Sequence, residues 1–568
     1  MKPRHIALLA IPVVLYLALA GTFLRAPLRW DETEWPRQAD AIARHGVPEV
    51  RQGESKLLVH PHSVDGRRYG GSDYGLWHPP LYLYLMSATR GVLGHSDAAA
   101  RALNLVLGAA AVGAVVFAVR REAQRRGWNR ARADRAALIA GTVLATNPFW
   151  VSGTMRLDID GPLLSLLEVL TLIVVVQADN AGRLRFRPAV GAVAGFVLIW
   201  AKPPGFGLLM LGLAALFVRS RNWNELWRLI RSSAVAVVSF AASWLLYAWL
   251  AGIPWRFPLD FTYLNKRARA APTPRDVVNI ARFNAAWIGW ALLAVGVAAV
   301  AYRIPRSRRS ATPADAFLAV ALVSAAYYTF AWTEIGKYTV PVVPLLCVGA
   351  AFVIAERAPL DKWASSVRQH PVLTGAAVLA STLFEFVVLG DAVTAPAGAR
   401  NLGLTLSTGL HDPRLRALAL GAVVVSAATV ALHRRETWLA SLLAAGLLLA
   451  VPSQLAEQAH VIAGATQTLV LSPSKDRGFK QTVTWLDRHV SSNTVVLADK
   501  DIAYQSKLNR VVPTDRAVNF TGQEVREWID RGLIEAVATH NDLLGGFQLG
   551  TRFTRVARFG DYSIFLRA

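Results

Sequence analysis

The residues best suited to chemistry are three carboxylates between two tryptophans, in the sequence WDETEW at residues 30–35. They follow an apolar run, Ile6 to Leu24, that is long enough to cross a bilayer. A carboxylate at a membrane surface can act as a general base or hold a metal ion on a lipid-linked substrate. Asp31 and Glu32 would also suit the start of a helix, because the positive end of the helix dipole favours acidic residues. Glu34 is assigned to that structural role alone.

A second acidic pair, Asp158 and Asp160, precedes Gly161 and Pro162 in a short turn between two apolar runs. Being two residues apart, these carboxylates could share a cation, or one could position the other. A helix start would explain them as well, since proline is favoured in the first helical turn. The predicted topology places Asp31 and Asp158 on the same side of the membrane, so the two acidic groups could meet at one site.

Two lysines interrupt apolar runs on that same side. Lys202 stands before two prolines, and Lys337 stands before Tyr338. A buried ammonium needs an anion, and lipid phosphate is available beside a membrane. Snorkelling of the lysines to the headgroups is the alternative. An anionic lipid head would also explain the basic residues of a long outer loop, which are Arg256, Lys266, Arg267, Arg269 and Arg275.

A divalent metal ion is an optional cofactor. Its candidate ligands are His60, His62, Glu32 and Asp160, with Asp65 and Asp73 near the two histidines. Loop histidines that bind no metal are the alternative. The single cysteine, Cys347, lies inside an apolar run, which excludes an intrachain disulfide and a cysteine-based metal cluster.

The composition predicts a multi-spanning membrane protein that must position these groups. Of 568 residues, 54% are hydrophobic and only 17% are charged, whereas soluble proteins are about 25% charged. The net charge of +23 lies largely in short arginine clusters between apolar runs. That placement sets membrane topology, and it argues against a nucleic-acid partner.

Apolar runs and the positive-inside rule together predict about thirteen spans. The loop 120–135, with seven arginines, marks the cytoplasmic side. The odd number of spans puts the termini on opposite faces, and the positive-inside rule places the N-terminus in the cytoplasm and the tail outside. The spans are predicted near 6–24, 98–119, 136–153, 161–177, 188–201, 204–218, 232–251, 285–302, 314–331, 339–355, 372–390, 414–432 and 437–453.

Residues 1–455 are therefore expected to form a transmembrane catalytic domain with long outer loops at 25–96 and 252–284. A helix that begins after Pro79 and Pro80 is expected to lie in the membrane interface. Residues 456–568 are expected to form a small extracytoplasmic α/β domain. Helices are predicted over 482–489 and 525–531, and strands over 494–498, 535–539 and 562–566.

The motifs resemble those of a known family in their order and sidedness. They are Asp31-Glu32-Thr33, the sequence HPPLY at 78–82, Leu157-Asp158, Lys202 and Lys337-Tyr338. The chain resembles the GT-C membrane glycosyltransferases, in the bacterial branch of the lipid A aminoarabinose transferase and the protein O-mannosyltransferases. The resemblance covers the whole chain.

This resemblance implies an enzyme of the bacterial cytoplasmic membrane that moves a sugar from a polyprenyl-phosphate carrier to a lipid, glycan or protein acceptor on the outer face. Asp31 matches the base that activates the acceptor, and Asp158 matches a second acidic position that assists it or helps to bind a metal. Lys202 and Lys337 match positions that meet the carrier phosphate. The remaining substrate-binding candidates are Glu32, His78, Tyr338 and Arg267.

One motif departs from the aminoarabinose branch, which has a Glu-Lys pair where this chain has Trp77 and His78. The aminoarabinose donor and the lipid A acceptor therefore do not follow from the resemblance. His78 would act on the phosphate or the acceptor, or it would cap the interfacial helix.

The chemistry agrees with the residues. A phosphate-linked sugar carries its own leaving group, so inversion needs one base for the acceptor and cations for the departing phosphate. The rival interpretation is a secondary transporter that uses Asp31, Asp158, Lys202 and Lys337 as a coupling network. Transporters place such charges near the bilayer midplane, whereas here the charges cluster at one face. A scaffold for envelope assembly is a third possibility.

Overall fold

The computed structural model describes residues 3–26, 30–51, 78–178, 184–256, 290–308, 311–330, 336–357, 478–514, 522–540 and 552–568, with a few short stretches and single positions between them. The chain divides into two compact units, each with its own hydrophobic core. The first unit comprises Met1–Arg25, Arg101–Ala242 and Ala271–Pro473. The second comprises Ala26–Ala100, Ser243–Ala270 and Ser474–Ala568.

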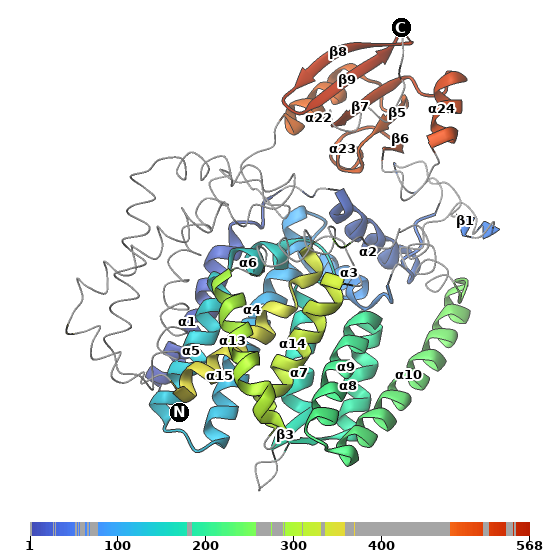
Figure 1. The fold of residues 1–568 in the computed structure, drawn as a ribbon. Coiled ribbons are helices and arrows are strands. Elements are labelled where there is room, and N and C mark those ends of the chain that lie inside the picture. Colours follow the sequence, from blue (N-terminus) through green and yellow to red (C-terminus); the bar gives the residue numbers. More distant parts are fainter. Residues whose placement is uncertain are drawn as a thin grey trace. The chain divides into compact units, whose positions relative to one another are not determined.

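The first unit is a bundle of apolar helices (Figure 1). α14 packs along α9 and α15, α15 packs against α5, and α5 packs against α1. The described helices, of which α4 and α10 extend past the borders of the unit, are α1 (Pro3–Gly21), α4 (Asp97–Arg125), α5 (Arg130–Thr146), α6 (Pro148–Met155), α7 (Pro162–Val175), α8 (Pro188–Ala201), α9 (Pro203–Arg219), α10 (Trp223–Ala251), α13 (Trp290–Ser307), α14 (Pro313–Phe330) and α15 (Val342–Arg357).

Three of the described helices, α4, α10 and α14, are long and apolar enough to cross a membrane, and several shorter ones are apolar. Every span predicted up to residue 355 overlaps a described helix of the bundle, although the spans 136–153 and 285–302 fall on α5, α6 and α13, which are not among these apolar helices. The spans predicted near 372–390, 414–432 and 437–453 lie outside the described residues, so the total number stays a prediction. The structure thus confirms a mostly helical protein with several apolar helices.

Two local features differ from the predicted pattern. The run 136–153 is divided between α5 and α6 at Asn147, whose side chain caps α6 by accepting from the Trp150 amide at 2.9 Å. Pro148 then occupies the first turn of α6, where its missing N–H costs no hydrogen bond. After α7, the chain forms a short antiparallel hairpin of β3 (Val176–Ala178) and β4 (Leu184–Phe186), which sequence reasoning missed.

The part of the second unit nearest the N-terminus contains a 3₁₀ turn, two helices and a minimal hairpin. The turn η1 (Trp30–Thr33) runs directly into α2 (Glu34–His45), and α3 (Leu81–Leu93) begins after the two prolines, as predicted. The ring of Trp35 meets that of Tyr82 edge to face, with centroids 5.2 Å apart. The hairpin strands are β1 (Ser63–Val64) and β2 (Arg67–Arg68).

The C-terminal part of the second unit is a five-stranded mixed sheet in the order β6-β5-β7-β9-β8. β5 is parallel to β6 and β7, and β9 is antiparallel to β7 and β8. The elements are α22 (Phe479–His489), β5 (Val495–Ala498), α23 (Lys500–Gln505), β6 (Arg510–Pro513), α24 (Gly522–Asp530), β7 (Ala536–His540), β8 (Phe553–Phe559) and β9 (Tyr562–Arg567).

The pattern of β5 explains why it lies inside this sheet. Its residues alternate between two cores: Val496 and Ala498 face one cluster, whereas Val495 and Leu497 face the other. Every residue of β5 is buried, as expected for a parallel strand covered on both faces. The helices and strands predicted in this segment are found as α22, α24, β5, β7 and β9. The predicted domain border at 455/456 lies outside the described residues.

Candidate active site

Lys202 is the single residue that joins α8 to α9. Because two prolines follow it, Lys202 is forced out of the helical region, and its backbone is extended at φ −158° and ψ 107°. Its N–H still closes α8 through Leu198, at 2.6 Å, and its carbonyl accepts from the Phe206 amide at the start of α9. The side chain therefore sits at a break between two apolar helices, on a backbone whose polar groups are satisfied.

Asp158 and Asp160 lie in the turn between α6 and α7. Asp160 donates its backbone N–H to the Asp158 carboxylate at 3.4 Å, and both side chains are buried. The backbone of Gly161 packs tightly against that of α6. A Cβ at this position would stand 2.9 Å from the carbonyl oxygen of Gly153. Asn104 of α4 also holds the turn, by donating to the Arg156 carbonyl at 2.7 Å.

These two breaks in the helices meet within the first unit. Lys202 donates to the Asp160 carboxylate, and both side chains are buried, at 3% and 2% exposure. The Lys202 ammonium also lies 4.7 Å from the centre of the Tyr338 ring. Tyr338 is stacked in turn on Tyr328 of α14, with ring centroids 5.8 Å apart. The structure therefore brings together Asp158, Asp160, Lys202 and Tyr338 of the predicted set, and it adds Tyr328.

This arrangement fixes a buried cation between a carboxylate and an aromatic ring. The attraction of the Tyr338 ring contributes about 0.5–2 kcal/mol to holding the ammonium. Burial makes the charge costly unless it is paired. Such an ammonium can bind a phosphate oxygen beside, or in place of, the Asp160 carboxylate.

The sequence WDETEW lies in the second unit. Asp31 belongs to η1 by its backbone, Glu32 is buried at 2% exposure, and Glu34 begins α2. His78 is half-buried and stands just before the prolines that start α3. The expected meeting of Asp31 with Asp158 would join the two units, and it stays a prediction.

Several predicted residues cannot be placed. The backbone of Lys337 lies in η2 (Gly336–Thr339), whereas Arg267, His60 and His62 lie outside the described residues. Within the described part of the chain, no group of three histidine, cysteine or acidic side chains could hold a metal ion. Asp160 is engaged with Lys202, and the metal roles of Glu32 and Asp160 stay predictions.

The comparisons with known proteins first define a class. The predicted resemblance is confirmed: the chain has the fold of the GT-C membrane glycosyltransferases of the aminoarabinose transferase and protein mannosyltransferase type. A family model described as dolichyl-phosphate-mannose-protein mannosyltransferase matches residues 77–246, from His78 and α3 to α10. No curated protein matches the chain significantly.

Particular solved structures are similar over nearly the whole length. ArnT from Cupriavidus metallidurans in the apo state has 15% sequence identity and a TM-score of 0.58, covering 99% of this chain and 97% of that one. The same protein bound to undecaprenyl phosphate has 16% identity and a TM-score of 0.56, with the same coverage. At this identity, the likeness establishes the fold.

Proposed function

We propose that this protein is an inverting glycosyltransferase that moves a sugar from a polyprenyl-phosphate carrier to a lipid, glycan or protein acceptor, at the outer face of the bacterial cytoplasmic membrane. The observation that carries the proposal is the buried Lys202 ammonium, held between Asp160 and Tyr338 where two apolar helices meet. The undecaprenyl phosphate bound to a protein of the same fold supports a phosphate-linked donor.

In the proposed reaction, Asp31 removes the proton from the acceptor hydroxyl as its oxygen attacks the anomeric carbon. The bond from that carbon to the phosphate oxygen breaks on the opposite side, so the configuration inverts. The electron pair leaves with the polyprenyl phosphate, whose growing negative charge Lys202 stabilises. Asp158, which receives the backbone N–H of Asp160, is assigned to supporting the base or the acceptor.

Sugar transfer by purified Asp31→Asn protein tests this proposal, with a panel of polyprenyl-phosphate sugars as donors. Asn keeps the size of the side chain but cannot accept the proton, so transfer is expected to fall by about 10²–10⁴-fold. Asp561→Asn is a matched control, because it makes the same change in the turn between β8 and β9. Undiminished transfer by Asp31→Asn, or loss only of solute uptake by intact cells, would overturn the proposal.

A further inference from the structure

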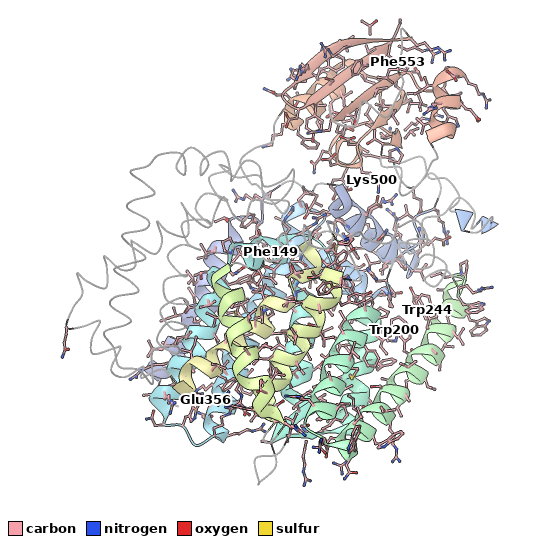
Figure 2. The ribbon with its side chains drawn as sticks, viewed as in Figure 1. Phe149, Trp200, Trp244, Glu356, Lys500 and Phe553 are labelled. Carbon is pink, nitrogen blue, oxygen red and sulfur yellow. The ribbon has the colours of Figure 1, made fainter. Side chains whose placement is uncertain are left out.

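The short helix α23 lies against η1, although about 470 positions separate them in the sequence. Both elements belong to the second unit. α23 contributes side chains from its two ends. Lys500 is its first residue and Gln505 its last, and each contacts a residue that holds one side of η1 (Lys500 is labelled in Figure 2).

The C-terminal side of η1 is held by a buried ion pair. The Lys500 ammonium lies 3.0 Å from the Glu34 carboxylate, and the two side chains are only 3% and 7% exposed. Glu34 also accepts from Arg37, one turn further along α2. Since Glu34 is the first residue of α2 and follows Thr33 directly, the pair fixes the point at which η1 becomes α2.

The N-terminal side of η1 is held through Asp97. One oxygen of the Asp97 carboxylate accepts from the Gln505 side chain at 3.0 Å and from the backbone N–H of Leu28 at 3.3 Å. Leu28 lies two residues before η1 begins. The two ends of α23 are therefore tied to both sides of the turn that contains Asp31.

α23 is itself anchored rigidly to the sheet. Asp499, just before it, accepts from the hydroxyls of Thr514 and Thr539, at 2.5 and 2.6 Å, and from the backbone N–H of His540 at 3.0 Å. These partners follow β6 or lie at the end of β7, so Asp499 joins the carboxyl ends of the parallel strands. Buried hydrogen bonds of this kind restrict the position of the next residue, Lys500.

We propose that α23 is a positioning element for the reaction, in which Lys500, through Glu34, and Gln505, through Asp97, hold η1 so that Asp31 can act as the base. The inference rests on the proposed function of Asp31. It gives Glu34 a role beyond starting a helix, and it gives the C-terminal sheet a part in turnover. Lys500 and Gln505 are positioning residues, because they act through other residues.

Steady-state kinetics of Lys500→Ala and Lys500→Arg in the full-length protein test the proposal. Lys500→Ala is expected to lower kcat by about ten- to hundredfold, since a displacement of about 1 Å costs that much. The KM for the polyprenyl-phosphate donor should stay within about twofold of the wild type, and Lys500→Arg should recover most of the loss. Lys507→Ala removes an exposed lysine just beyond α23 and should change neither constant.

A double-mutant cycle separates positioning from general destabilisation. In an Asp31→Asn background, Lys500→Ala should cause no further loss of kcat, because it acts through the base that is already missing. Gln505→Ala, which removes a neutral side chain, provides a second variant if Lys500→Ala does not fold. It should lower kcat by about threefold or more at unchanged KM.

Unchanged kcat in both Lys500→Ala and Gln505→Ala would overturn this inference, as would losses that add to that of Asp31→Asn. If Asp31→Asn keeps its transfer activity, the proposed function fails first. If Asp31→Asn is inactive while the two α23 variants turn over normally, only the inference about α23 fails.

Discussion

The two ends of the helical bundle both contain buried ion pairs, but the pairs are built differently. At one end, Arg303 forms a two-pronged contact with Asp315, at 2.8 and 2.9 Å, and also donates to Thr312. Arg126 joins Glu122 and Glu356 beside it (Glu356 is labelled in Figure 2). At the other end, Lys202 faces Asp160 and the Tyr338 ring.

The difference is one of chemistry. A guanidinium is a rigid fork that matches carboxylates in a fixed geometry, so the arginine end is suited to holding helices together. A lysine ammonium is a point charge with rotatable donors, and it can exchange partners. The comparison suggests that the arginine end stabilises the bundle, whereas in the proposed function the Lys202 end binds the carrier phosphate.

Replacement of Arg303 tests whether the arginine end stabilises the bundle. Arg303→Met leaves Asp315 buried without its main partner, which should destabilise the protein by roughly 3–5 kcal/mol. Thermal unfolding in detergent measures this loss. Protein that remains folded at low temperature should keep transfer activity within about threefold. Arg308→Met, at an exposed position near the end of α13, is the control. A stable but inactive Arg303→Met would erase the distinction between the two ends.

Replacement of Lys202 tests whether the other end of the bundle has a functional role. Lys202→Met should lower sugar transfer by about 10²–10³-fold, the usual cost of losing one group that stabilises developing charge. It also leaves the buried Asp160 carboxylate without its lysine partner. The double variant Lys202→Met with Asp160→Asn removes both charges and should regain thermal stability without regaining transfer. Recovery of transfer by the double variant would show that Lys202 is structural, like the arginines.

Glu34 and Lys500 form a further buried ion pair, in the second unit, which tests whether a lysine pair can also stabilise the protein. Burial alone would raise the pKa of Glu34, but Arg37 and Lys500 outweigh it and lower the pKa from 4.5 to about 2. A carboxyl with a lowered folded pKa contributes stability above its unfolded pKa and loses it as pH falls through the folded value.

Glu34→Gln should therefore destabilise the protein by about 1–3 kcal/mol near neutral pH. Relative to the wild type, that deficit should shrink as the pH falls from about 4.5 towards 2. Thermal unfolding of both proteins across this range measures it. Glu527→Gln, on α24, is the control for loss of one carboxylate. If the loss of stability in Glu34→Gln did not depend on pH, the ion pair with Lys500 could not be its cause.

The smallest effect is expected from the ring beneath Lys202. Tyr338→Leu removes the cation–π contact, which contributes about 0.5–2 kcal/mol, so donor KM should rise by roughly two- to thirtyfold. Tyr338→Phe keeps the ring and should stay within about twofold of the wild type. Equal effects of the two substitutions would assign the role of Tyr338 to its hydroxyl.

Apolar patterning predicted the bundle well because most of the described helices begin at a proline or end at an arginine or glycine that the sequence displays. The break at Lys202 follows from two prolines, and the start of α3 follows from Pro79 and Pro80. The division at Asn147 was missed, because the run remains apolar across a helix cap.

The candidate site was only partly predictable. Residue type and sidedness singled out Asp160 and Lys202, but their pairing depends on how α7 and α9 pack, and no local spacing encodes that. Glu34 was assigned to a helix start because its partner, Lys500, lies in a segment that sequence reasoning did not connect to it. Tyr328 was missed because one aromatic residue in an apolar span carries no distinguishing signal.

The contact between α23 and η1 has a consequence for the order of events during synthesis. At about 5–20 residues per second, a ribosome that has made Glu34 needs roughly 20–90 seconds to reach Lys500. Throughout that interval the N-terminal turn lacks its partner helix, while the spans between them enter the membrane. A nascent or truncated chain that ends before Lys500 therefore lacks the contacts that, in the proposed mechanism, hold η1 around Asp31.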